Sequence, residues 1–140
     1  MDALEPHRQL ADADFILQFT ECRLPPEHFT HEAHLRLAWV HLTQVGLQRA
    51  ITRVRADLRR YTRHVGAEAK YHDTLTTAAV HAVDHFQRQR PMGDFASFIE
   101  AHPALMTNFK GLLATHYDPE LLATAEARAN YVAPDRQPFN

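Results

Sequence analysis

The chain has 140 residues, a formal net charge of −2 with histidine neutral, and a single cysteine. This length fits one domain, and one cysteine excludes both an internal disulfide and a cysteine-based zinc site. No apolar run reaches the roughly 18 residues of a membrane span, and the first residues lack the features of a signal peptide. We therefore expect one cytoplasmic domain over residues 1–140, with 1–11 and 134–140 extended or poorly ordered.

Helical patterns follow one another along the first half of the chain. A first helix is predicted over Asp12–Cys22, and the Pro-Pro pair that follows stops it. A second helix begins near Thr30, which has the side chain of an N-cap, and ends before Gly46. A third is predicted over Leu47–Val65, where apolar residues recur every three or four positions.

A fourth helix is predicted over His72–Arg90, and shorter helical segments follow it. Asp94 caps one of them, Phe109–Leu113 suggests another, and Asp118 begins a third with proline and an acid in its first turn. No run alternates apolar and polar residues with the period of a strand. The fold class is therefore predicted as all-α, a compact bundle of four main helices with short C-terminal helices.

The predicted third helix is strongly basic. It carries six arginines against a single acidic residue, Asp57; the arginines are Arg49, Arg53, Arg55, Arg59, Arg60 and Arg63. A basic helix can bind nucleic acid, or it can be a solvated face that also pairs with acidic neighbours. Because no recognition motif accompanies the arginines and the whole chain is not basic, we favour the second interpretation.

Histidine is the unusual residue in this composition, with 11 copies. His31 and His34 fall three residues apart on one face of the predicted second helix, with Cβ atoms about 5–6 Å apart. Two imidazoles so placed can bind one metal ion. The intervening spacing is HExH and not the HExxH of zinc peptidases, so we exclude a peptidase.

His72 is the best candidate for a third metal ligand. In an up-down bundle, the starts of the second and fourth helices share one end, which would bring His72 to His31 and His34. Three histidines leave open coordination positions, as catalytic metal sites do. Zinc, copper, iron and nickel all suit such a set, and the metal would activate water or bind a substrate oxygen.

Two further residues are candidates for a catalytic role beside this metal. Tyr71 could donate a hydrogen bond, and Arg128 could bind an anion if its short helix folds over the site. Glu32 is a poor general base, because it points about 100° away from His31 on the helix.

Other histidines leave alternatives open. His81 and His85 lie at i and i+4, which is also good chelating geometry, but too far along the helix to share a metal with His72. Whether His28 or His41 takes part is not decided by the sequence.

Three short motifs in this chain form a pattern. They are Phe-x-His-x-x-His-Leu at Phe29–Leu35, Tyr-His-x-Thr at Tyr71–Thr74, and a C-terminal Ala-Arg followed by Pro-Asp, at Ala127–Arg128 and Pro134–Asp135. With them the chain resembles a group of small uncharacterised bacterial helical proteins, from about Phe15 to its end. The resemblance implies that His31, His34 and His72 belong together, and it brings no activity with it.

Three functional hypotheses follow. The first is a metal-binding protein with a divalent metal at the three histidines, which as a small metal-dependent enzyme would act on a small-molecule substrate. The second is a non-catalytic helical binding module with structural or pH-responsive histidines. The third, nucleic-acid binding through the arginines, ranks last. A homodimer through an exposed helix face is compatible with each of them.

Overall fold

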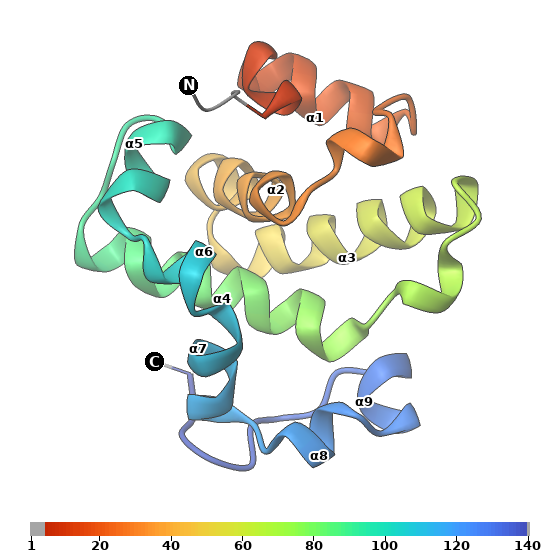
Figure 1. Ribbon diagram of the computed structural model, residues 1–140, viewed down its shortest axis with the longest axis vertical. Helices are drawn as coiled ribbons and strands as arrows, with labels where there is room; N and C mark the ends of the chain where they lie inside the picture. Colours follow the sequence, from red (N-terminus) through yellow and green to blue (C-terminus); the bar gives the residue numbers. More distant parts are fainter. Residues whose placement is uncertain (1–4, 140) are drawn as a thin grey trace.

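The computed structural model describes residues 5–139, and within them the fold is all-α, as predicted, with no strand (Figure 1). The α-helices are α1 (Asp12–Thr20), α2 (His31–Val45), α3 (Leu47–His64), α4 (Asp73–Gln89), α5 (Phe95–Ala101), α6 (Ala104–Thr107), α7 (Phe109–His116), α8 (Pro119–Leu122) and α9 (Ala125–Ala129). Short 3-10 helices span Pro6–Gln9, Pro26–His28 and Glu68–Lys70. Across these described residues, each helix is too short or too polar to pass through a bilayer.

Side chains and glycine fix the helix ends where the sequence indicates. The Thr30 hydroxyl accepts a hydrogen bond from the Ala33 amide at 3.2 Å and so caps α2. Gly46 ends that helix with φ at 82°, a left-handed conformation that costs glycine little. Asp94 and Asp118 cap α5 and α8 through their carboxylates. These starts and stops are confirmed.

Four helix ends differ from the prediction by one or two residues, those of α1 and α3 and both ends of α4. Helix α1 stops at Thr20 because the chain reverses there, and Cys22 adopts a positive φ of 58°. Helix α4 begins at Asp73, one residue later than predicted, because His72 is not helical. Instead, the His72 ring accepts a hydrogen bond from the Leu75 amide at 3.1 Å and caps the helix.

Helices α2, α3 and α4 pack against one another and form the centre of the fold. Helix α1 lies across α2 and α3 at one end of the molecule (Figure 1). It buries Phe15 and Phe19 completely, and the Phe19 ring stacks on Tyr61 of α3 with centroids 4.4 Å apart. Burying such aromatic side chains supplies much of the driving force for the fold.

Helix α4 is covered on two sides. One side joins the main apolar core through Val80 and Val83, and the other meets Leu113 and Tyr117 of the C-terminal segment through Ala78. Small residues on α4 let both neighbours approach closely. The C-terminal helices therefore lie against the same helix that His72 caps, as Figure 1 shows for α9.

The carboxylate of Asp73 is fully buried at the start of α4. Arg55 of α3 donates two hydrogen bonds to it, at 2.9 and 2.7 Å, and Arg59 lies 3.2 Å away. The Tyr71 hydroxyl donates a third bond at 2.6 Å. Burial alone would raise the pKa of Asp73, but the bonds from Arg55 and Tyr71 outweigh it and lower the pKa. The buried charge is thus paired, and it joins α3 to α4.

The two ends of the chain pack on the bundle. Residues 1–4 and 140 lie outside the described part of the chain, so the expectation for them is not addressed. The 3-10 helix Pro6–Gln9 occupies a segment that we expected to be extended, and His7 within it is fully buried. The tail after Tyr131 contains no helix, and the Phe139 ring stacks on His81 with centroids 4.2 Å apart.

Candidate functional site

His34 lies in the first turn of α2 with an unsatisfied ring nitrogen. Its Nε2 atom is buried and has no hydrogen-bond partner among the described residues. One face of the ring stacks on Phe29, with centroids 5.6 Å apart. Burial, and to a smaller extent the neighbouring His31, lower the pKa of His34 to about 4. The imidazole is therefore neutral at neutral pH, and its Nε2 atom offers a ligand an N–H group in one tautomer and a lone pair in the other.

His72 is held by the backbone through both ring nitrogens. Nδ1 accepts from the Leu75 amide at 3.1 Å, so Nε2 carries the proton and donates it to the Leu122 carbonyl at 2.7 Å. The side chain is almost entirely buried. To bind a metal, His72 would have to give up the cap of α4 or its bond to α8.

His31 is exposed and points to a different neighbour. Its Nε2 atom donates to the Leu105 carbonyl of α6 at 3.0 Å, and its ring meets the edge of Phe109. In the described chain, the one group of three potential metal ligands with all donor atoms within 4.8 Å is Glu5, His7 and Glu32. The structure does not bring His31, His34 and His72 together in that way.

His34 and His72 do share a cavity. It has a volume of about 350 Å³ and lies between the start of α2, the end of α3 and the start of α4. Phe29, Tyr61 and Tyr71 form part of a wall that is largely apolar. An apolar cavity of about 300 Å³ or more with a few polar groups is typical of small-molecule sites.

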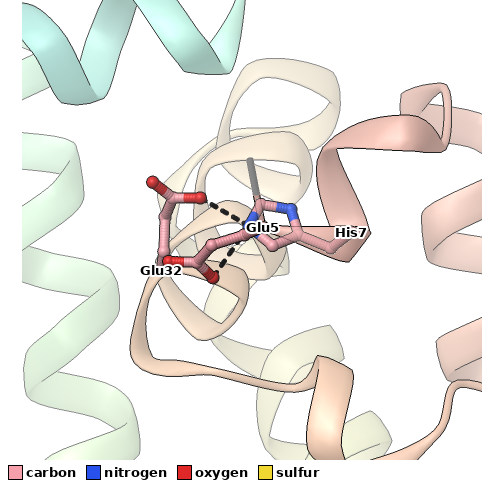
Figure 2. Close-up of side chains that lie close together, drawn as sticks. All are labelled: Glu5, His7 and Glu32. Atoms are coloured by element: carbon pink, nitrogen blue, oxygen red, sulfur yellow. Dashed lines mark hydrogen bonds and ion pairs between the residues drawn. The ribbon is translucent and has the colours of Figure 1, made fainter. Parts of the chain in front are cut away.

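Glu5, His7 and Glu32 form a separate cluster that attaches the N-terminal segment to α2 (Figure 2). His7 Nε2 lies 2.6 Å from Glu32 Oε2 and 3.5 Å from Glu5 Oε1. Arg8 forms two hydrogen bonds with the Glu32 carboxylate. Arg36 donates to the His7 carbonyl at 2.6 Å and lies 3.3 Å from its Nδ1.

These arginines decide what the cluster does. Because an arginine can only donate, Nδ1 of His7 accepts from Arg36. Nε2 of His7 therefore carries the proton and donates a hydrogen bond to Glu32. Burial lowers the pKa of His7 although the bond to Glu32 opposes this. Burial would raise the pKa of Glu32, but bonds from Arg8 and His7 lower it. A cation would have to displace this proton and compete with two guanidinium groups, so the cluster fits a structural role better than a metal site.

Tyr71 and Arg128, the residues predicted to assist catalysis, each form hydrogen bonds within the protein. The Tyr71 hydroxyl is bonded to Asp73, and burial together with this bond raises the pKa of Tyr71 to about 12. Tyr71 therefore positions the start of α4 and walls the cavity. Arg128 is exposed and donates to the Ala69 carbonyl at 3.0 Å, so α9 does fold against the segment before α4.

The remaining histidines lie elsewhere. His41 is buried between α2 and α3, with Nε2 3.5 Å from Asp57, and His28 is half-buried in the 3-10 helix before α2. His81 and His85 line a second cavity of about 160 Å³ together with His116. None of these four positions predicted as alternatives lies in the His34 cavity.

The sequence did not indicate several residues that form the N-terminal cluster and the His34 cavity. His7 and Arg8 carry no motif, and their partner Glu32 is about two dozen residues away. Tyr61 of α3 also lines the cavity, and it lies outside the motifs. A signal for Glu32 does exist, because it interrupts the apolar positions of a helix and so requires a buried partner.

Comparisons with protein-family models, with curated proteins and with solved structures found no match for this chain. The resemblance to small bacterial helical proteins therefore stays a prediction, and a function can be inferred only from the geometry of the candidate site.

Replacement of Glu32 by glutamine tests the structural role of the N-terminal cluster. The change removes the charge that Arg8 and His7 share, and breaking a buried pair by removing one partner costs about 3 kcal/mol. Urea denaturation should show that loss, and hydrogen exchange should accelerate in residues 5–10. Glu21→Gln, in an exposed pair with Arg23, should change stability by less than about 0.5 kcal/mol. Equal effects of the two variants would contradict this role.

A pH titration followed by NMR tests the neutrality of His34. In the folded protein this imidazole should titrate near pH 4, against 6.5 for an unperturbed histidine. Between those values the unfolded chain binds a proton that the folded chain does not, so stability falls as the pH drops from 6.5 toward 4. The His34→Gln variant should show a shallower pH dependence. Titration of the native His34 ring near pH 6.5 would contradict its burial.

Proposed function

We propose that this protein binds a small, largely apolar molecule in the His34 cavity, as a helical binding module. The observation that carries the proposal is the buried, unpaired Nε2 atom of His34 beside an apolar cavity of about 350 Å³. A buried polar atom without a partner costs stability. A ligand that forms a hydrogen bond with this atom would remove this cost, and its apolar part would contact Phe29 and Tyr61.

The fixed surroundings of the cavity support this function. His72 and Tyr71 are each held by hydrogen bonds to the start of α4, so two walls are ordered before a ligand arrives. A preformed site loses less conformational entropy on binding than a flexible one. Because its pKa is about 4, His34 is a neutral hydrogen-bonding group and is too weak a base for efficient proton abstraction at neutral pH.

Phenol and toluene are suitable matched probes, because they differ by a hydrogen-bond donor on the same ring. In NMR titrations of the labelled protein, phenol should shift resonances of His34, Phe29 and Leu75 and bind more tightly than toluene. His34→Phe should abolish the preference for phenol, whereas His85→Phe should leave it intact. Phenol shifts confined to other surfaces, or a preference that survives His34→Phe, would refute the proposal.

A metal-dependent function is the second candidate. It is favoured by the proximity of His31 to His34 on α2 and by the neutral His34 ring, which does not need to release a proton to bind zinc, copper, iron or nickel. The hydrogen bonds of His72 to Leu75 and Leu122 weigh against it. In this function the metal would supply a Lewis acid or an activated water at open positions.

Metal analysis by inductively coupled plasma mass spectrometry, after incubation with Zn²⁺ and dialysis, tests this candidate. It predicts one metal ion per chain, lost in His31→Ala and in His34→Ala and retained in His85→Ala. Substoichiometric metal in the native protein, or equal metal content in all variants, would exclude it.

A further inference from the structure

A third cavity, which is basic, adjoins the His34 cavity. It has a volume of about 380 Å³, and Thr62 and Tyr71 line both cavities. Its charged residues are Arg59, Arg63 and Arg128 against one acid, Glu68. The basic cavity and the apolar His34 cavity therefore lie side by side, with Thr62 and Tyr71 at their common boundary.

The internal ion pairs leave two of these arginines available. Arg59 lies 3.2 Å from the buried Asp73 and over the Tyr71 ring, so the protein already uses its charge. Arg63 is 73% exposed, and the one carboxylate paired with it among residues 5–139, that of Glu68, is 3.6 Å away and 67% exposed. A solvent-exposed pair at this distance is weak and is easily exchanged for another anion.

Arg128 reaches the same cavity from a different element. Its Nη1 atom donates to the carbonyls of Ala69 at 3.0 Å and Tyr71 at 3.5 Å. These bonds fix the side chain against the segment before α4, while no carboxylate of residues 5–139 forms an ion pair with it. The Nε and Nη2 groups keep their N–H donors. A guanidinium group fixed in this way is suited to bidentate contacts with a carboxylate or a phosphate.

We infer that the ligand of the His34 cavity is an anionic amphiphile, a small molecule whose apolar part lies against Phe29 and Tyr61 and whose carboxylate or phosphate is bound by Arg63 and Arg128. This inference rests on the proposed function and adds the chemical class of the ligand. Lys70, which precedes Tyr71 in the chain and lines the His34 cavity, adds a third cation.

The same ion pairs argue against a nucleic-acid surface along α3. Arg55 and Arg59 neutralise Asp73, and Arg60 lies 2.5 Å from Asp57. Half of the arginines of this helix thus balance acids within the protein. The positive charge that is left near the cavities is local, which suits a single anionic group better than a phosphate backbone that requires many contacts.

Three probes with one apolar group test the inference, namely 3-phenylpropionate, 3-phenylpropanamide and 3-phenylpropyl phosphate. Dissociation constants come from NMR titrations of the full chain. A charge-assisted hydrogen bond changes affinity by about tenfold, so at least one of the two anions should bind about tenfold more tightly than the amide. Comparison of the two anions identifies the preferred group.

Arginine variants locate the anion. Arg63→Gln and Arg128→Gln should each weaken the preferred anion by about tenfold and leave the amide unchanged. Arg53→Gln is the matched control, an exposed arginine of α3 outside both cavities. Because Arg128 also holds the backbone of Ala69, amide spectra and thermal unfolding should accompany its variant, and Arg63 tests the inference without that contact.

The outcomes separate this inference from the proposed function. Equal binding of the amide and both anions at His34, or an anion preference that survives both Arg63→Gln and Arg128→Gln, would overturn the inference and leave the proposed function standing. Failure of all three probes to shift His34 and its neighbours would overturn both.

Discussion

The ion pair at the start of α4 is the interaction on which the rest of the site depends. A fully buried carboxylate such as Asp73 is tolerated only when its charge is paired and hydrogen-bonded, and Arg55 and Tyr71 provide those bonds. The position also suits an acid, because the N-terminal end of a helix favours negative charge. Asp73 thereby fixes the distance between α3 and α4 at the point where both cavities form.

Several features of the site follow from this anchor. Tyr71 turns its hydroxyl to Asp73 and its ring into the wall that both cavities share. His72, one residue later, is placed to cap α4 and to bond to Leu122 of α8. Among residues 5–139, Nε2 of His34 on the opposite wall has no such partner. Its place at the cavity distinguishes His34 from His41, which also has unpaired ring nitrogens but does not line the cavity.

The sequence predicted the helices well because their determinants are local. Thr30, Gly46 and Asp94 end or begin helices through contacts within a few residues, and such contacts can be inferred from spacing. The placement of His34 and His72 near the same end of the bundle also followed from topology. The tautomer and the partners of His72 could not be predicted, because a histidine that caps a helix and one that binds a metal occur in similar local sequences. The contacts of His7 with Glu32 and of Asp73 with Arg55 join distant segments, so no local pattern shows them.

The proposed function depends above all on His34, whose neutral ring offers a nitrogen to a ligand in an open cavity. A high-resolution crystal structure of the protein tests it directly. We expect density for ordered water or a small molecule within hydrogen-bond distance of His34 Nε2, with His72 still bonded to Leu75 and Leu122. A His34 nitrogen bonded to a donor of the protein itself, with side chains filling the cavity, would contradict the account.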